Sequence, residues 1–301
     1  MTRDAHTTEP GVQTEPGLCI AAGRTRFSYP KAVAVGPDGG VYAGCCGWSG
    51  GLERFSLAGG ALVSEWGVED GKACGIAFTP AGNVCVTVHE SEGPCVRQFA
   101  PDGTTLRRWG RNGDVRLGNP QGIAVDSCGR FYVVEANRWG GEDLARLNCV
   151  QRFGPDGGCQ VRWGTTGTAP GQVNLPVGVA VDRRDRVFVA DAYNCRIQAF
   201  APEGGFLSVW GSLGRGPGEF DCPQGVALDA VGRVYVADTY NNRVQILTPD
   251  GGPLAQWGGE GTEPGRLWLP CGVAVDGAGR VYVADTMNHR IQVFHPDLPE
   301  A

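Results

Sequence analysis

Short alternating runs of apolar and polar residues, separated by turns rich in Gly and Pro, follow one another along almost the whole chain. In the clearest stretch, residues 225–229 read Gly-Val-Ala-Leu-Asp and residues 233–238 read Arg-Val-Tyr-Val-Ala-Asp. A third run covers residues 243–247, and a fourth, after the turn at residues 249–251, ends at Trp257. Because successive side chains of a strand point to opposite faces, each run predicts one short strand. The stretch is therefore a unit of four strands, a to d.

This unit recurs six times. The residue that leads strand a recurs at spacings of 43, 47, 56, 47 and 47, and five of the fourth strands end in Trp-Gly. Short strands at even spacing with one aromatic residue per unit are typical of a β-propeller. The sequence thus predicts an all-β fold, a six-bladed β-propeller of four-stranded antiparallel blades. The leading residues are Pro30, Ala73, Pro120, Pro176, Pro223 and Pro270, and the tryptophans are Trp66, Trp109, Trp163, Trp210 and Trp257.

The two ends of the repeat array complement each other. The sixth unit stops after its third strand, at residues 290–294, whereas residues 18–22 precede the first strand a, where a fourth strand would lie. We expect this N-terminal strand to complete blade six, because a closed ring has no open edges. The predicted organisation is one propeller domain over residues 17–298, preceded by a polar, disordered tail at residues 1–16.

Composition excludes several classes of protein. The 49 Gly and 20 Pro residues fit many tight turns, and the net charge of −6 argues against a general nucleic-acid binder. No apolar run is long enough to span a membrane, and residues 1–10 lack the apolar core of a secretory signal. We therefore expect a cytoplasmic protein whose twelve cysteines are reduced; without any Cys-x-x-Cys pair, they do not form a zinc-finger framework.

The end of each well-formed unit carries a further motif, Ala-Asp-x-x-Asn-x-Arg followed by Ile or Val and Gln. It begins with Asp191, Asp238 and Asp285 in blades four, five and six. Together with the strand-a and Pro-Asp-Gly phrases, this motif resembles the NHL repeat family of six-bladed propellers over residues 18–297. The match is close in blades four to six, carries an insertion in blade three and is degenerate in blades one and two. The resemblance implies the fold; for function it implies partner-binding scaffolds, RNA readers or, in one branch, lyases.

The repeated residues are expected to be structural. An Asp at the end of strand b can cap the turn between strands b and c, and the Arg that follows can pair with it. The tryptophans are expected to pack between blades. In strand a, Gly225 and Ala227 alternate with Val226 and Leu228, and we expect the small pair to face the crowded channel axis.

Function is expected at the end of the propeller where the b–c loops lie, because these loops vary between units on a rigid frame. Blade three has nine additional residues there, within residues 137–147, and Arg and Trp are frequent anchors at interfaces. The alternative is a tolerated insertion that packs on the ring. The candidates are Arg138, Trp139 and Arg146 in the insertion, Trp48 in blade one, His89 and Glu90 in blade two, Tyr193 in blade four and Tyr240 in blade five.

One further position per blade, directly before the strand-a glycine or alanine, should border the channel. It holds Lys31, Cys74, Gln121, Val177, Gln224 and Cys271. The resemblance to amidating lyases would place metal-binding His there, and the resemblance to lactonases would place carboxylates and Asn; none is present. Cys74 and Cys271 flank Lys31, so they are weak candidates for a soft metal ligand or a reactive thiol. The favoured interpretation is two small buried residues.

These observations predict a non-catalytic binding scaffold that holds a protein segment, or a small ligand, on the b–c loop face and at the channel mouth. The predicted ligand-binding set is Lys31, Trp48, His89, Glu90, Gln121, Arg138, Trp139, Arg146, Tyr193, Gln224 and Tyr240. We expect a monomer without a cofactor. One alternative is a lyase or hydrolase at the channel mouth that uses Cys74, Cys271, Lys31 and His89, with a metal as an option. The second is single-stranded RNA binding, which the acidic charge disfavours.

Overall fold

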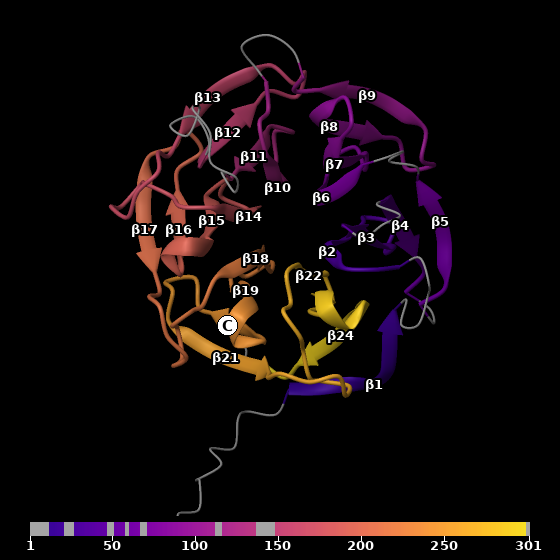
Figure 1. Cartoon of the computed structure of the whole chain (residues 1–301), viewed down its shortest axis with the longest axis vertical. Coiled ribbons are helices and arrows are strands. Elements are labelled where there is room, and N and C mark those ends of the chain that lie inside the picture. The colour runs from indigo at the N-terminus through magenta and orange to yellow at the C-terminus, as the bar shows by residue number, and fades with distance from the viewer. Residues whose placement is uncertain are drawn as a thin grey trace, which may run out of the picture.

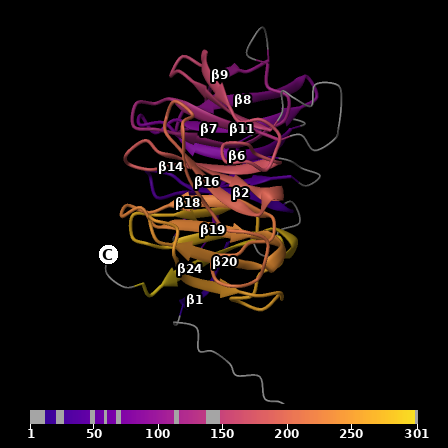
Figure 2. The same ribbon diagram turned by 90° about the vertical axis from the view of Figure 1, so that its left-hand side faces the viewer.

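Six four-stranded sheets surround a central channel like the blades of a propeller (Figure 1). The computed structural model describes residues 12–20, 27–46, 51–57, 60–66, 71–111, 116–136 and 148–298, with side chains from residue 19 onward. Every blade is antiparallel, and its strands run in the order a, b, c, d from the channel outward. The predicted all-β six-bladed propeller is confirmed. Figure 2 shows the successive blades from the side.

The strands are short and close to their predicted positions. Blade one contains β2 (Pro30–Val35), β3 (Val41–Cys45), β4 (Gly51–Phe55) and β5 (Leu62–Trp66), and blade two contains β6 (Lys72–Phe78), β7 (Val84–Glu90), β8 (Gly93–Phe99) and β9 (Thr105–Trp109). Blade three contains β10 (Pro120–Val125), β11 (Phe131–Glu135), β12 (Cys149–Phe153) and β13 (Cys159–Trp163), and blade four contains β14 (Pro176–Val181), β15 (Val187–Asp191), β16 (Arg196–Phe200) and β17 (Phe206–Trp210). Blade five contains β18 (Pro223–Leu228), β19 (Val234–Asp238), β20 (Arg243–Leu247) and β21 (Pro253–Gly258). Blade six contains β22 (Val273–Val275), β23 (Val281–Asp285), β24 (Arg290–Pro296) and β1 (Val12–Ile20).

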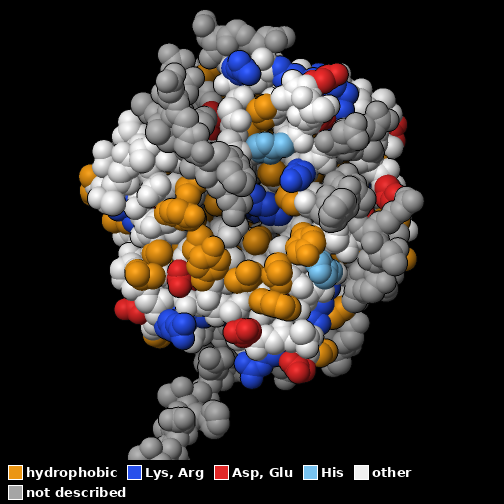
Figure 3. Space-filling model, in the orientation of Figure 1, with side chains coloured by type: hydrophobic (Ala, Val, Ile, Leu, Met, Phe, Trp, Pro, Cys, Tyr) orange, Lys and Arg blue, Asp and Glu red, His pale blue; other side chains and the backbone are white. Residues whose placement is uncertain are grey.

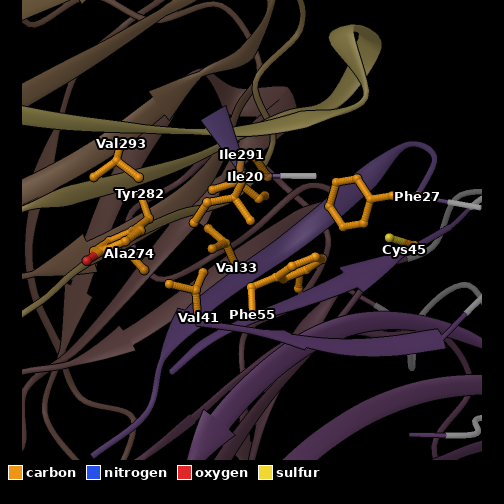
Figure 4. Close-up of a cluster of buried hydrophobic side chains, with 12 residues drawn as sticks. Ile20, Phe27, Val33, Val41, Cys45, Phe55, Ala274, Tyr282, Ile291 and Val293 are labelled. Atoms are coloured by element: carbon orange, nitrogen blue, oxygen red, sulfur yellow. The ribbon is translucent and has the colours of Figure 1, made fainter. Parts of the chain in front are cut away.

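Strand β1 closes the ring by pairing with β24, with Ile20 opposite Ile291. It starts at Val12 and ends at Ile20, so it begins earlier than the predicted range 18–22. Ile20 is fully buried, and Figure 4 shows it beside Ile291 and close to Val33 and Phe55 of blade one. The closing strand therefore joins blade six to the core that blades six and one share.

The inner strands approach one another very closely. A Cβ added at Gly75 on β6 would lie 2.7 Å from the Gln121 carbonyl oxygen on β10, and one at Gly122 would lie 2.6 Å from the Val177 carbonyl on β14. The same crowding recurs at Gly272, beside the Lys31 carbonyl of blade one. The strand-a glycine therefore faces the neighbouring inner strand. This corrects the expectation that it faces the channel axis, and it explains why only the smallest residues fit there.

The tryptophans pack between blades, as predicted. Trp210 ends β17, and its ring lies against Gly251 in the c–d hairpin of the next blade. Gly251 has a φ of +86°, and its N–H donates to the Thr248 carbonyl at 2.9 Å, which gives the Pro-Asp-Gly turn the geometry that Gly favours. The same packing joins Trp66 to Gly103, Trp109 to Gly157 and Trp163 to Gly204.

The repeated aspartates hold each blade together from inside. Asp238 is fully buried and accepts bonds from the main-chain N–H of Asp221 at 2.7 Å, Asn241 Nδ2 at 2.9 Å and Arg243 Nε at 2.7 Å. Gln245 Nε2 donates a fourth bond at 3.1 Å. The pairing with Arg was predicted. The cap differs, because the carboxylate bonds to the d–a return and to side chains, with no cap bond to the 3₁₀ turn η4 (Thr239–Asn241). Asp191 and Asp285 repeat this pattern.

The b–c turns and the d–a returns lie at one end of the propeller, where they bond to each other. The main-chain N–H of Tyr193, in the turn η3 (Ala192–Asn194), donates to the Asn174 carbonyl at 3.1 Å. Tyr240 and Met287 donate in the same way to Asp221 and Trp268, and Met287 belongs to η5 (Thr286–Asn288). These bonds hold the b–c turns of blades four, five and six in place at this end of the propeller. None of the described helices is long and apolar enough to cross a membrane.

Candidate functional site

One residue from each inner strand borders the channel mouth, at the position expected from the repeat. The channel is lined by Lys31, Cys74, Val177, Gln224 and Cys271, and Gln121 lines a pocket beside it. Figure 3 shows positively charged and histidine side chains next to the central hollow, and hydrophobic side chains gathered over the blades below it. The mouth therefore has a polar side and an apolar side.

A second set of side chains lies outside this ring, and sequence reasoning recognised only His89 among them. Each comes directly after the residue of strand b that lies opposite the leading residue of strand a. Each also directs a polar atom at the main chain of the next blade. Aligning the units at strand b would have found Cys46, which holds the place of threonine in blades five and six. The contacts are Cys46 Sγ to the Ala73 carbonyl at 3.7 Å, His89 Nε2 to Pro120 at 2.9 Å, Thr239 Oγ1 to Pro270 at 2.8 Å and Thr286 Oγ1 to Pro30 at 2.7 Å.

The two rings meet between blades one and two in a cluster of thiols and bases. The Cys74 thiol donates to the Lys72 carbonyl at 3.7 Å, and Cys46, His89 and Lys31 act on its pKa. A carbonyl oxygen only accepts hydrogen bonds, so His89 Nε2 carries the proton that it shares with Pro120. In the neutral imidazole the other ring nitrogen, Nδ1, is then an acceptor.

The cluster shifts the acidity of its members in opposite directions. The pKa of Cys74 lies well below its ordinary value because of the hydrogen bond from Cys46 and then, against the cost of burial, because of His89 and Lys31. The pKa of Cys46 is raised, first by its bond to Cys74 and then by burial. Burial alone would lower the pKa of His89, but the bond to Cys74 and the negative charge there raise it overall. Cys74 is thus the thiol that ionises first.

Lys31 reaches across the mouth. Its ammonium donates to the side-chain oxygen of Gln121 at 2.5 Å, and Gln121 Nε2 donates to Asn119 Oδ1 at 2.9 Å. Because Gln121 is buried, the position of the Lys31 ammonium is set by a fixed acceptor. A positive charge held in this way at a hollow favours an anionic ligand group.

The adjoining pocket brings together five of the residues predicted to bind a ligand. Lys31, Gln121, Gln224, Tyr193 and Tyr240 line it, and they come from blades one, three, five, four and five. The cavity itself is small, about 40 Å³. Tyr193 and Tyr240 remain 59% and 51% exposed, which leaves their rings available for contact.

Glu90 does not join this group. It lies at the end of β7, opposite Gly93, so the predicted b–c loop of blade two is a tight turn between long strands. Its carboxylate forms ion pairs with Arg97, at 2.5 Å, and with Arg111. Glu90 is therefore occupied in an ion-pair cluster between strands of blade two, and its role in ligand binding stays a prediction. The sequence around Glu90 does not reveal these ion pairs, because Arg97 lies across the hairpin and Arg111 lies in the neighbouring d–a return.

Four predicted residues lie outside the described part of the chain. They are Trp48, Arg138, Trp139 and Arg146. Their proposed role as anchors stays a prediction from the sequence.

Cys74 and Cys271 both line the channel, at the positions expected from the repeat. The Cys74 thiol contacts the Lys72 carbonyl at 3.7 Å, and the Cys271 thiol contacts the Leu269 carbonyl at 3.6 Å. Within the described residues, no group of three or more His, Cys, Asp and Glu side chains is arranged to hold a metal ion.

Comparison with known protein families supports the repeat assignment. The family pattern described as NHL repeat matches residues 173–200, 220–247 and 267–294, which contain strands a to c of blades four, five and six. The resemblance to NHL repeats is confirmed, on a six-bladed β-propeller. NHL repeat-containing protein 3 of Mus musculus is 33% identical over 86 residues, which are 28% of this chain and 22% of that relative. The match thus spans less than a quarter of that relative's length.

Solved structures share the fold over nearly the whole chain. A gluconolactonase of Xanthomonas campestris has a TM-score of 0.69 and 17% identity, with 99% of this chain and 94% of that chain covered. A structure described as streptogramin B lyase has a TM-score of 0.63 and 13% identity, with 92% and 96% covered. At these identities the likeness shows the fold alone.

Proposed function

We propose that this NHL-repeat propeller is a non-catalytic binding module that holds a protein segment at the mouth of its channel. The observation that carries the proposal is the pocket where Lys31 and Gln121 of the polar side meet Tyr193 and Tyr240 of the apolar side. Tyr is a frequent anchor at interfaces because it offers a large, rigid surface. A carboxylate at Lys31 with an apolar or aromatic group on the tyrosines would use both sides.

Charge supports an acidic group on the ligand. Among the described residues that line the channel and this pocket, none is acidic, and Lys31 carries the positive charge. The whole chain carries a net charge of −6, so the cationic mouth is a local exception. A side-chain carboxylate or a C-terminal carboxylate fits this exception. A nucleic-acid backbone fits the overall charge poorly.

A selection experiment tests the proposal. A library of random peptides displayed on phage would be selected on the wild-type protein and counter-selected on the Lys31→Met variant. We expect enriched peptides to carry a carboxylate beside an apolar residue and to lose about tenfold in affinity for Lys31→Met, which corresponds to roughly 1.4 kcal/mol. Arg184→Met removes a charge from an exposed residue of the a–b hairpin and should leave affinity unchanged. Peptides that bind wild type and Lys31→Met equally would contradict the site.

The tyrosines provide a second arm of the same test. Tyr193→Ser and Tyr240→Ser remove exposed rings. The main-chain N–H groups of these residues hold the turns and are kept in both variants, so the turns should persist. We expect each substitution to weaken the selected peptides about fivefold to tenfold. Phe206→Ser, on an exposed outer strand, serves as the matched control. An equal loss in all three variants would indicate nonspecific adhesion.

An enzymatic alternative, a lyase or hydrolase, has a specific observation in its favour: Cys74 lines the channel on β6, and His89 lies on the neighbouring strand β7. The similar structures described as a gluconolactonase and a streptogramin B lyase show that some proteins with this fold are named as enzymes. The two proposals differ in what happens to a bound ligand. Mass spectrometry of a selected peptide after prolonged incubation should show it unchanged. Conversion of the peptide by the wild type, but not by Cys74→Ser, would replace the binding proposal with the enzymatic one.

We further propose that the protein is a monomer and that it is located in the cytoplasm. All twelve cysteines are free thiols, as expected in a reducing compartment. Sedimentation of the purified protein under reducing conditions should give one species with the mass of a single chain. A concentration-dependent increase in mass would contradict the monomer.

A further inference from the structure

We propose that the channel mouth binds the last residue of a partner chain, with its free C-terminal carboxylate on the polar side of the pocket and its apolar side chain on Tyr193 and Tyr240. The inference rests on the binding function proposed above and deepens it, because it names the part of the partner that enters the pocket. It also gives Gln224 a direct contact with the ligand and makes Gln121 a positioning residue.

Hydrogen-bonding side chains stand on alternate blades around the mouth. Lys31 lies on β2 of blade one, Gln121 on β10 of blade three and Gln224 on β18 of blade five, and all three line the same pocket. The blades between them carry weaker hydrogen-bonding groups or none at this position: Cys74, Val177 and Cys271. The strong donors therefore reach the mouth from three directions.

The two glutamines differ in their partners. Gln121 accepts a hydrogen bond from the Lys31 ammonium at 2.5 Å and donates one to Asn119 Oδ1 at 2.9 Å, so both ends of its amide are engaged. Within the described part of the chain, no residue forms a hydrogen bond with the Gln224 side chain, which is half-buried and lines both the channel and the pocket. Because a partly desolvated amide gains by finding a partner, Gln224 is the donor left for a ligand.

Lys31 supplies the charge that Gln224 lacks. Its ammonium has three N–H donors, and Gln121 accepts one of them, so further donors remain for a ligand. A carboxylate has two oxygen atoms, one for Lys31 and one for Gln224, and hydrogen bonds between a cation and an anion are roughly twice as strong as neutral ones. An amine at the other end of a chain would be repelled by Lys31.

The size of the pocket favours a chain end over a chain that passes through. The cavity is about 40 Å³, and one water molecule needs about 10–15 Å³ of such space. There is thus room for roughly three water-sized groups, which is what the carbon and two oxygens of a carboxylate require. A continuous peptide chain does not fit.

The position of the apolar wall favours the α-carboxylate over the carboxylate of an internal Asp or Glu. Lys31 and the two exposed tyrosines, Tyr193 and Tyr240, border one small cavity, so the charged and apolar groups of the ligand must lie close together. The last residue of a chain carries its carboxylate and its side chain on the same Cα atom. An internal acidic residue separates its carboxylate from the next apolar side chain by many bonds, and its chain would have to continue on both sides of the mouth.

The test compares two libraries of N-acetylated hexapeptides of random sequence, one with a free C-terminal carboxylate and one with a C-terminal amide. Each library is incubated with the full chain, and the bound peptides are identified by mass spectrometry. We expect bound peptides to come from the carboxylate library and to end in an aliphatic or aromatic residue. The best of them should lose at least about tenfold in affinity when made again as the amide.

The outcomes separate this inference from the function on which it rests. Amide peptides with an internal Asp or Glu that bind the wild type as tightly as the acids, but bind Lys31→Met weakly, would overturn the C-terminal inference and leave the proposed function standing. Binding that Lys31→Met does not weaken in either library, or the recovery of no bound peptide, would overturn both.

Substitutions at Gln224 test its direct contact. Gln224→Leu removes the donor, and we expect it to weaken the best acid about fivefold to tenfold. Gln224→Glu places a negative charge beside the bound carboxylate and should weaken it further. Gln160→Leu, at an exposed position of β13, is the matched control and should leave affinity unchanged. Thermal melting establishes that each variant is folded, and equal affinity in wild type, Gln224→Leu and Gln224→Glu would remove Gln224 from the site.

Discussion

The ammonium of Lys31 lies 2.5 Å from the side-chain oxygen of Gln121, although the two residues belong to blades one and three. The bond joins the inner strands of two blades that are not neighbours, because blade two lies between them. Hydrogen bonds to charged groups in partly buried positions contribute about 1.5–3 kcal/mol. This bond therefore sets the position of the one cation at the mouth among the described lining residues.

A double-mutant cycle measures this bond. Lys31→Met, Gln121→Met and the double variant should each lower the free energy of unfolding in urea, with a coupling energy of about 1 kcal/mol or more. The double variant is the internal control, because it removes both partners and leaves neither polar group unpaired. Strictly additive effects would show that the bond does not form in solution.

Packing between outer strands predicts a difference between two glycines. Gly251 and Gly279 have φ values of +86° and +80°, but only at Gly251 would a new Cβ overlap the Trp210 ring; nothing lies within 4 Å of a Cβ at Gly279. Both alanine variants carry the backbone cost of about 1 kcal/mol. Gly251→Ala should lose about 1–3 kcal/mol more from the clash. Urea denaturation of both variants gives the comparison, and equal losses would place the Trp210 ring elsewhere.

The buried aspartates should be essential for folding. Asp238→Ala leaves the Arg243 guanidinium buried without its partner, a change that typically costs about 3–5 kcal/mol. Asp238 is fully buried, and burial raises its pKa even beside Arg243. Asp250→Ala, at an exposed turn, should change stability by less than about 0.5 kcal/mol. Denaturation midpoints measure both, and a stable Asp238→Ala protein would contradict the structural role of the motif.

Ring closure depends on the side chain of Ile20. It is fully buried and pairs with Ile291 on β24, so Ile20→Ala should cost about 2–5 kcal/mol. Val231→Ala removes methyl groups from a residue that is 53% exposed and should have little effect. If differential scanning calorimetry gave the two variants the same melting temperature, β1 would not be part of the core.

The lowered pKa of Cys74 predicts how the reactivity of its thiol depends on pH. Only the thiolate reacts with iodoacetamide, so the alkylation rate of Cys74 should be flat near pH 9 and fall only well below it. In denaturant the same cysteine should lose reactivity below its ordinary pKa, which gives the reference curve. A native curve that coincides with the denatured one would show that Cys46, His89 and Lys31 do not act on it.

The shift in the pKa of Cys74 also predicts how the stability of the protein depends on pH. The folded pKa of Cys74 lies below the unfolded value, so its contribution to stability is present above the unfolded pKa and is lost as the pH falls through the folded pKa. His89 has the opposite sign: its contribution is present below about 6.5 and is lost as the pH rises through its raised folded pKa. Cys74→Ser should therefore cost more stability at pH 9 than at acidic pH.

The repeat was sufficient to predict the fold, because the period of two along each strand and the Gly and Pro turns are local signals. The closing role of residues near Ile20 followed from a count of strands. The strand-a glycines were placed on the wrong face, since the approach of the next inner strand depends on the ring and not on the unit.

The site was less predictable than the fold. Lys31, Gln121 and Cys74 were found because one position per blade faces the channel, which is a property of the repeat. The contacts of Cys46 and Glu90 were not foreseen because their partners come from other strands: Cys46 meets the Ala73 carbonyl of the next blade, and Glu90 meets Arg111 across a return. Contacts between units depend on how the ring closes, so they cannot be predicted from the sequence of a single unit.

Strand β1 also bears on how the molecule is made. During synthesis the segment that becomes β1 is translated before the other strands of the propeller, whereas its partner β24 is translated at the far end of the repeats. Five blades can assemble in order from local hairpins, but the sixth must wait for a contact of very high sequence separation. Until then β24 exposes a bare edge, and the nascent propeller is vulnerable to pairing with other chains.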